Sequence, residues 1–337
     1  MVSSRNHLLG MAALLAASAV GQYTLVDNYD INNFFTEGFS FFSQPDPTHG
    51  FVRYATAQAA SDRLLAGYAQ GAVYLGVDHK TAPEEINGGR GSTRVTSTKA
   101  YTKGLFVADI AHMPVGCGVW PAFWTVGPQW PSSGEIDILE GVNSATTTQY
   151  TLHAGSGCRV EATGPLEESD CNADEGKKGC GVKSTDPQTF GTGFNAIGGG
   201  VYIAEWTSEA ISIWFFPRGS PQATALAAHN DTAGPDVASF GPPATRFTGC
   251  DFDAHFKQHN LVFNTALCGD WAGNQQVWQA DETCSKLAPT CQDYVTANPG
   301  AFTQAYWLVN RVAVFQQGAA PEAGAGAQGR KGRRFVA

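Results

Sequence analysis

Three carboxylic acids lie close together in the segment from Trp130 to Asn143, which reads WPSSGEIDILEGVN. Glu135, Asp137 and Glu140 occupy half of a six-residue run, and aliphatic residues fill the other positions. Paired carboxyl groups can break glycosidic bonds, because one attacks or acts as a base while the other donates a proton to the leaving oxygen. Clustered acids can also bind calcium or form a solvated acidic surface.

The spacing of the acids favours an irregular strand over a helix. On a helix, Glu135 and Glu140 would lie roughly 140° apart around the axis and point away from each other. On a regular strand, Asp137 shares a face with Glu135 but Glu140 faces the opposite side, because side chains alternate. One extra residue between Asp137 and Glu140, a β-bulge, returns Glu140 to the face of the other two acids. The Ile and Leu residues between them then form a buried reverse face.

This arrangement predicts a specific chemistry. With the bulge, the carboxyl groups of Glu135 and Glu140 are expected to lie roughly 5 Å apart. Retaining glycosidases hold their two carboxyls at about 5 to 5.5 Å, whereas inverting enzymes need a wider gap to admit water. Asp137 keeps the local field negative, which is expected to raise the pKa of one glutamate and supply a proton donor.

The chain as a whole has the composition of one large β domain. Its 337 residues are 43% hydrophobic, and no long window has the spacing of an amphipathic helix. Short runs rich in β-branched and aromatic residues recur between turn formers at 104–110, 201–206, 210–216, 261–267 and 307–315. This pattern predicts an all-β antiparallel sandwich or barrel, without a linker that would divide it.

The two ends are expected to lie outside this domain. Residues 1–21 combine Arg5, a short apolar run and small residues, which is typical of a secretory signal rather than a membrane span. Residues 318–337 are basic and poor in apolar residues, and we expect them to be disordered. Secretion favours pairing of the eight cysteines, with the connectivity left open, and Asn230 begins a glycosylation sequon.

The charge of the chain limits its partners. The formal net charge is −9, although both ends are basic, so the body between them is more acidic still. Nucleic acid is therefore excluded as a partner, whereas an uncharged polymer is compatible.

At this point a family resemblance becomes specific. Residues 104–143 resemble the catalytic segment of the secreted fungal-type endo-1,3(4)-β-glucanases of glycoside hydrolase family sixteen, whose signature is E-x-D-x-x-E. Similar segments follow the order of those proteins at 45–52, 191–220, 268–273 and 306–316. The resemblance implies a β-jelly-roll sandwich, concanavalin A-like, of two antiparallel sheets with a concave catalytic groove. It covers roughly residues 23 to 317, and we expect the catalytic domain at 22–317.

The resemblance also implies roles for single residues. Glu135 matches the nucleophile, Glu140 the general acid/base and Asp137 the assisting carboxylate of a double displacement that retains configuration. His153 matches a family histidine near the acid/base, where it is expected to hydrogen-bond Asp137 or Glu140. A core or surface histidine without such a role is the alternative.

Four further residues are expected to contact the substrate. Trp130 matches a residue that stacks on a sugar beside the cleavage point, and Trp271 a platform on the facing side. Trp124 is a further aromatic candidate, although any single tryptophan also suits a core. Arg94 matches a family arginine that binds sugar hydroxyls or anchors a strand, and the sequence leaves both roles open.

These observations predict a secreted, monomeric enzyme without metal or cofactor. Its expected reaction is the retaining endo-hydrolysis of β-1,3- or mixed-linkage β-1,3/1,4-glucan. Two alternatives stay open on the same fold: a non-catalytic β-glucan-binding or recognition protein, and a glucan transglycosylase. The intact glutamate pair argues against the first, and product length distinguishes the second from a hydrolase.

Overall fold

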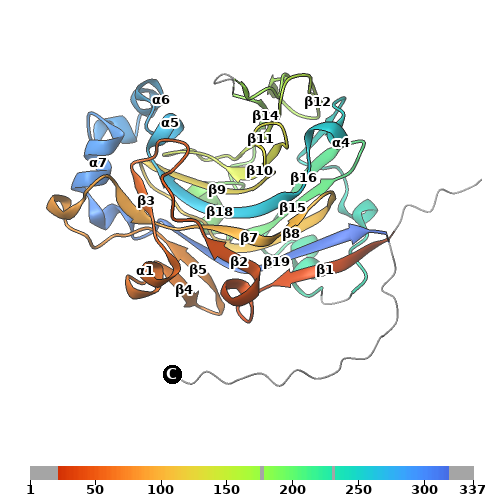
Figure 1. The fold of residues 1–337 in the computed structure, drawn as a ribbon, viewed down its shortest axis with the longest axis horizontal. Helices are drawn as coiled ribbons and strands as arrows, with labels where there is room; N and C mark the ends of the chain where they lie inside the picture. Colours follow the sequence, from red (N-terminus) through yellow and green to blue (C-terminus); the bar gives the residue numbers. More distant parts are fainter. Residues whose placement is uncertain (1–21, 175–177, 230–231, 319–337) are drawn as a thin grey trace, which may run out of the picture.

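Two large antiparallel sheets lie face to face in the computed structural model, which describes residues 22–174, 178–229 and 232–318 (Figure 1). This arrangement confirms the expected all-β sandwich. The expected signal at 1–21, the sequon residue Asn230 and the tail from 319 onward lie outside the described residues.

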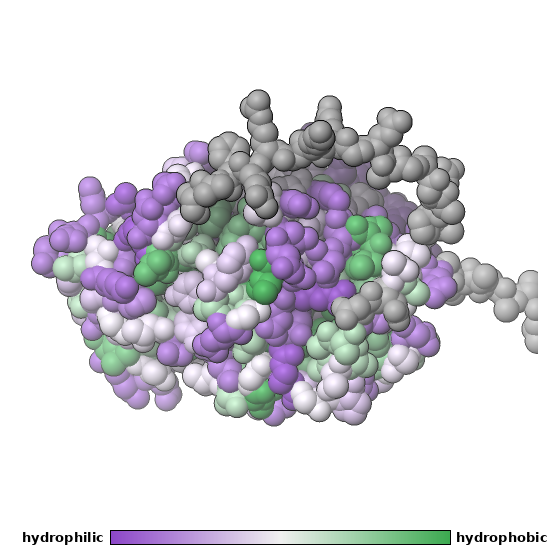
Figure 2. Space-filling model, turned by 90° about the horizontal axis from the view of Figure 1, so that it is seen from below, coloured by the Kyte–Doolittle hydropathy of each residue, from purple (hydrophilic) through white to green (hydrophobic). Residues whose placement is uncertain are grey.

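The outer sheet has nine strands; the sequence runs at 104–110, 201–206 and 307–315 fall within them, and the run at 210–216 begins one residue before β16. In spatial order the strands are β12 (Glu161–Ala162), β17 (Thr245–Thr248), β16 (Ile211–Pro217), β15 (Gly200–Trp206), β8 (Gly104–His112), β19 (Tyr306–Gln317), β5 (Ala72–Gly76) and β4 (Ala66–Ala69), with β1 (Tyr23–Tyr29) also paired to β19. Seen from below in Figure 2, this side mixes hydrophilic and hydrophobic residues rather than gathering one broad apolar patch.

The inner sheet has eight strands and curves so that its free face is concave (Figure 1). In spatial order they are β13 (Leu166–Glu168), β14 (Cys180–Lys183), β11 (Gln149–His153), β10 (Glu135–Glu140), β9 (Val119–Val126), β18 (His259–Leu267), β7 (Arg94–Tyr101) and β2 (Phe39–Phe41). Two short strands, β3 (Val52–Tyr54) and β6 (Arg90–Ser92), form a separate parallel pair.

The core between the sheets decides which face of each inner strand is free. Phe123, Ile136 and Phe263 from the inner sheet belong to the same buried cluster as Phe106 and Trp307 from the outer sheet. Burying each such side chain contributes about 1.5–3 kcal/mol. Because side chains alternate along a strand, this core forces the intervening residues of β9, β10 and β18 onto the concave face.

The helices of the described residues are short and lie in the connections between strands. The α-helices are α1 (Ala57–Asp62), α2 (Gly191–Ala196), α3 (Pro221–Ala227), α4 (Phe252–His255), α5 (Gly269–Ala272), α6 (Gln275–Ala280) and α7 (Cys291–Ala297). The other helical turns are η1 (Phe34–Gly38), η2 (Pro83–Glu85), η4 (Val237–Phe240), η5 (Cys284–Lys286) and η6 (Pro299–Phe302). In this part of the chain, no helix has the length and apolar character needed to cross a membrane.

All eight cysteines pair, as the sequence predicts. The disulfides are Cys117–Cys284, Cys158–Cys250, Cys171–Cys180 and Cys268–Cys291. Cys117 precedes β9 and Cys268 follows β18, so two of these bonds fasten the helical segment 269–302 to one end of the inner sheet. Trp271 lies within this fastened segment.

Removing the Cys268–Cys291 bond is expected to destabilise the protein. The bond joins residues 23 positions apart, and closing a loop of this size contributes about 3 kcal/mol by restricting the unfolded chain. The double variant Cys268→Ala/Cys291→Ala should lose that amount in urea unfolding. An unchanged free energy of unfolding would contradict the assignment of this bond.

Candidate active site

Strand β10 carries the three acids and contains the β-bulge predicted from their spacing. Its antiparallel pairs with β9 are Glu135–Val126, Asp137–Trp124 and Glu140–Ala122. The β9 partners are two residues apart, so all of them face the same side, and directly opposite residues share a face. The register shifts between Asp137 and Leu139, which leaves Ile138 as the extra residue. The three acids therefore share one face, as expected.

The reverse face of β10 is buried, also as predicted. Ile136, Ile138 and Leu139 are almost completely inaccessible and belong to the central core. Glu135 and Glu140 at the two ends of the strand are partly exposed, whereas Asp137 between them is buried. The bulge thus separates an apolar face from an acidic one within six residues.

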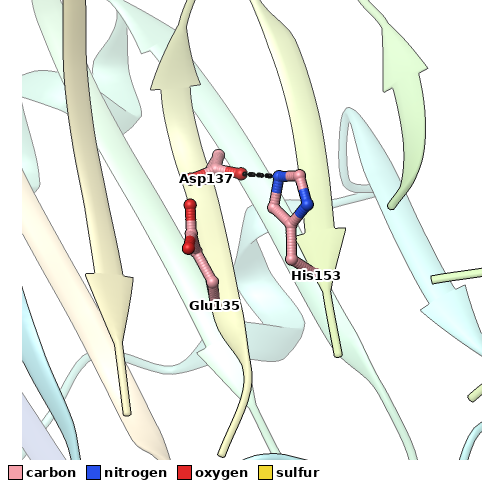
Figure 3. A group of neighbouring side chains, drawn as sticks. All are labelled: Glu135, Asp137 and His153. Atoms are coloured by element: carbon pink, nitrogen blue, oxygen red, sulfur yellow. Dashed lines mark ion pairs between the residues drawn. The ribbon is translucent and has the colours of Figure 1, made fainter. Parts of the chain in front are cut away.

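His153 extends toward the acids from the neighbouring strand β11 (Figure 3). Its Nε2 lies 3.2 Å from Oδ2 of Asp137, one of the two partners expected from the sequence. Gly179 makes room for the imidazole, because a Cβ at that position would lie 2.6 Å from the Nδ1 of His153. Gly179 also has a φ of +77°, which favours glycine. A larger residue there would displace the imidazole from Asp137.

Glu140 is held by a tryptophan to which the sequence interpretation gave no role. The Nε1–H of Trp120 donates a hydrogen bond of 2.8 Å to Oε1 of Glu140. Trp120 lies two residues before Ala122 on β9 and therefore faces the same side, a signal that strand alternation contained. Its ring makes an edge contact with Trp271, with the centroids 5.6 Å apart. The structure thus links Trp271 to the acid cluster.

Burial raises the pKa of every acid in the cluster. It raises the pKa of Glu135 to about 8, with the charge of Asp137 acting in the same direction and His153 opposing it. It raises the pKa of Glu140 to about 7, although the hydrogen bond from Trp120 lowers it. The pKa of Asp137 also lies well above its usual range, mainly through burial and then through the charge of Glu140.

The pKa is raised at more of the acids than the sequence predicts. The sequence interpretation raises the pKa of one glutamate through the charge of Asp137, whereas burial shifts the pKa of both glutamates. The three acids therefore titrate as a coupled group. The raised pKa values show that the group retains protons near neutral pH, and they belong to the group rather than ranking Glu135 against Glu140.

Trp124 and Arg94 lie together on the concave face. The Nε1–H of Trp124 donates to Oδ1 of Asn264 at 2.7 Å, and Asn264 pairs with Arg94 across β18 and β7. The Arg94 guanidinium lies over the rings of Phe42 and Trp124, at 4.3 and 5.0 Å from their centroids. This support of two aromatic rings differs from both roles expected for Arg94, which were to bind sugar hydroxyls or to anchor a strand, and those two roles stay predictions. Asn264 was missed, because its place depends on strand pairing between distant segments.

Trp130 is the most accessible of the expected aromatic residues. Its side chain is 53% exposed in the loop that joins β9 to β10, five positions before Glu135. The Trp130 indole lies close enough to Glu135 to lower its pKa slightly by hydrogen bonding. The structure thus places Trp130 beside the acids, whereas Trp124 lies on the strand next to them.

Three of these side chains also have donor atoms suited to a metal ion. One atom each from Glu135, Asp137 and His153 lies within 4.8 Å of the others. Calcium prefers an all-oxygen shell, so the imidazole makes the calcium interpretation of the acid cluster a poor fit. The same residues form the contact between His153 and Asp137 and part of the acid cluster, so a bound metal ion would disrupt both.

Comparison with known proteins points to the same family as the resemblance found in the sequence. A family model described as "XgeA-like, catalytic GH16 domain" matches residues 39–315. The endo-1,3(4)-beta-glucanase of Arthroderma benhamiae is 43% identical over 326 residues, which cover 93% of this chain and 68% of that protein. The chain spans about half the length of further curated fungal relatives.

Solved structures are also similar over their whole length. Laminarinase 16A of Phanerochaete chrysosporium, solved with β-glucans in donor and acceptor sites, is 36% identical with a TM-score of 0.81. The match covers 88% of this chain and 100% of that one. An elongating GH family 16 beta-1,3-glucosyltransferase is 40% identical with a TM-score of 0.78, over 87% of this chain and 100% of that one.

The raised pKa of Glu140 predicts a pH-dependent gain in stability when its charge is removed. Its pKa rises from 4.5 to about 7 on folding, so the native state binds the proton more tightly and stability falls as pH rises through this window. Glu140→Gln removes this cost and still accepts a hydrogen bond from Trp120. We expect its Tm to exceed that of the unsubstituted protein by about 2–4 °C at pH 8 and to match it at pH 4.

Differential scanning calorimetry at both pH values measures this difference. Glu167→Gln, the same change at an exposed position, is the control and should give the same small effect at both. A Glu140→Gln variant that loses stability at pH 8 would contradict the prediction.

Proposed function

This chain belongs to glycoside hydrolase family 16, and we propose that it is an endo-β-glucanase that hydrolyses β-1,3- or mixed-linkage β-1,3/1,4-glucan with retention of configuration. The observation that carries the proposal is the face shared by Glu135 and Glu140 on β10. The glucanase names of the fungal relatives and the β-glucans bound in the related laminarinase support the substrate class.

In this mechanism Glu135 attacks the anomeric carbon while Glu140 protonates the leaving glycosidic oxygen. The charge of Glu135 raises the pKa of Glu140, so an ionised nucleophile helps to keep the acid protonated. Once Glu135 has become a neutral glycosyl ester, that charge is gone and Glu140 ionises more readily. Glu140 then acts as the base that activates the incoming water.

Asp137 and His153 act as supports in this proposal. Asp137 lies beside Glu135 on the same strand face, and its contact with His153 fixes its orientation. The hydrogen bond between the two carboxyls raises the pKa of Glu135 and lowers that of Asp137, so Asp137 can accept the proton that Glu135 must lose before it attacks.

Aromatic rings provide the sugar-binding surface in this proposal. Trp130 is the exposed ring beside Glu135, and Trp271 reaches the other glutamate through Trp120. Trp124 lies next to Asp137 across the β9–β10 pair, with Arg94 over its ring. Aromatic faces on both sides of the acids suit an endo-acting enzyme, because a chain can extend past the cleavage point in both directions.

A glucan transglycosylase is the second candidate. The specific observation that favours it is the 40% identity to an elongating β-1,3-glucosyltransferase of the same family. Transfer uses the same glycosyl-enzyme and differs only in the acceptor, which is a sugar hydroxyl instead of water. A binding-only protein is disfavoured, because the chain retains both glutamates in an environment that raises their pKa values.

We further propose that the protein acts outside the cell as a monomer, with 22–317 as the catalytic domain, 1–21 as its signal and 318–337 as a tail. The four disulfides support an oxidising compartment. On the one face seen in Figure 2, the mix of hydrophilic and hydrophobic residues is consistent with a monomer, because broad apolar patches usually mark interfaces.

Glu135→Gln is expected to reduce the hydrolysis of laminarin by at least about a thousandfold, because an amide cannot form the glycosyl ester. Binding of laminarin-derived oligosaccharides, measured by calorimetry, should stay nearly unchanged. Glu205→Gln, at a half-buried glutamate on the outer sheet, is the matched control and should retain full activity. Near-normal turnover by Glu135→Gln would remove Glu135 from its proposed role.

The same assay separates hydrolysis from transfer. With laminari-oligosaccharides as substrate, a hydrolase gives only shorter products. Products longer than the substrate, detected by mass spectrometry at early times, would favour the transglycosylase.

A further inference from the structure

The loop 127–134 connects β9 to β10 and carries Trp130 to the edge of the acid cluster. We propose that His259, buried beneath this loop, is a positioning residue that holds the loop and thereby sets the place of Trp130 relative to Glu135. The inference rests on the proposed function only for its kinetic consequence. The structural part rests on the contacts of His259 and on the hydrogen bonds within the loop that it contacts.

His259 is the first residue of β18 and is completely buried. Its Nδ1 lies 2.7 Å from the hydroxyl of Thr125 on β9, and its Nε2 lies 2.7 Å from the carbonyl oxygen of Ser133 in the loop. A single imidazole therefore bridges strand β9 and the loop that follows it. Trp206 and Phe256 contact the same ring, with centroids 4.8 and 5.8 Å away.

The chemistry of these partners fixes the state of the imidazole. A carbonyl oxygen only accepts, so Nε2 must carry a hydrogen and donate it to Ser133. Burial lowers the pKa of His259 to about 4, so the ring is neutral at neutral pH and Nδ1 accepts from the hydroxyl of Thr125. Both ring nitrogens are thus used, one as donor and one as acceptor, in a pocket that a charged side chain would not suit.

Ser133 is itself hydrogen-bonded to another residue of the loop. The Ser133 hydroxyl accepts from the backbone N–H of Gln129, and the Ser133 N–H donates to the Gln129 carbonyl. These two bonds enclose Trp130. The loop is closed at its base by a bond from the Gly127 N–H to the Gly134 carbonyl. A shift of Ser133 would therefore move the whole turn that presents Trp130.

The base of the loop is packed too closely to admit a side chain at either of its two glycines. A Cβ at Gly127 would lie 2.3 Å from the Cβ of Ser133, and one at Gly134 would lie 2.4 Å from the ring of Phe256. Gly134 directly precedes Glu135. His259 thus supports both the exposed ring of the loop and the strand end that carries the proposed nucleophile.

A double-mutant cycle tests whether His259 acts through Trp130. His259→Phe keeps a ring in the pocket but removes both hydrogen bonds, and we expect kcat/KM on laminarin to fall about tenfold. His259→Gln keeps an N–H donor and should recover part of this loss. In a Trp130→Ala background, His259→Phe should change kcat/KM by less than about twofold, because the ring it positions is gone.

Trp206→Phe is the control for a general loss of core packing, because it alters the same pocket and leaves both hydrogen bonds of His259 in place. It should lower Tm while leaving kcat/KM near the wild-type value. An equal loss of kcat/KM in Trp206→Phe and His259→Phe would overturn the proposal. The proposal would also be overturned if His259→Phe lowered kcat/KM as much in the Trp130→Ala background as in the wild-type protein.

Hydrogen exchange separates this inference from the proposed function. Mass spectrometry should show faster exchange in peptides covering 127–134 in His259→Phe, less acceleration in His259→Gln, and wild-type exchange there in Trp206→Phe. Unchanged exchange of the loop in both His259 variants would overturn the positioning role. If the wild-type protein cleaved no glucan, the proposed function would fail while the exchange result would still decide whether His259 holds the loop.

Discussion

The extra residue at Ile138 is the constraint on which the site depends. The core requires Ile136 and Leu139 to face inward while Glu135 and Glu140 share the concave face. Strict alternation would separate both pairs, because it places residues an odd number of positions apart on opposite faces. The bulge resolves this conflict, because Ile138 is absorbed into the buried side and the strand resumes its pairing with β9. Without it, a regular strand could satisfy neither the core nor the acid cluster.

The second requirement is electrostatic, and it opposes stability. Three carboxyl groups on one face, one of them buried, cannot all ionise at neutral pH without a cost. His153 and Trp120 offset part of this cost by lowering the pKa of their neighbours, yet burial still dominates for both glutamates. The strain is functional, because the same burial that disfavours charge supplies a proton donor and a responsive base within one site.

Much of this site could be predicted from the sequence because its decisive information is local. The spacing of Glu135, Asp137 and Glu140 predicts the strand, the bulge and the shared face, and the structure confirms all three. The resemblance adds the expectation that His153 lies near the acids. In the structure, the pairing of β11 with β10 brings it to Asp137. The roles of these residues stay proposals, as do the ends of the catalytic domain.

The remainder depends on pairing between distant segments, which residue spacing does not encode. Asn264 lies 140 residues from Trp124, and His259 lies 126 residues from Ser133. The disulfide connectivity is non-local in the same way, and so is the burial that raises the pKa of both glutamates. Trp120 is an intermediate case, because alternation along β9 already places it on the face of the acids.

The anomeric configuration of the first product tests the shared face most directly, because the separation of the two carboxyls decides whether water or Glu135 attacks the sugar. Proton NMR during the first minutes of laminarin cleavage distinguishes the two newly formed reducing ends before they interconvert. Two acids on one face, at the separation of roughly 5 Å expected from the sequence, predict that the β-anomer appears first. Initial formation of the α-anomer would contradict the geometry that the bulge is inferred to create.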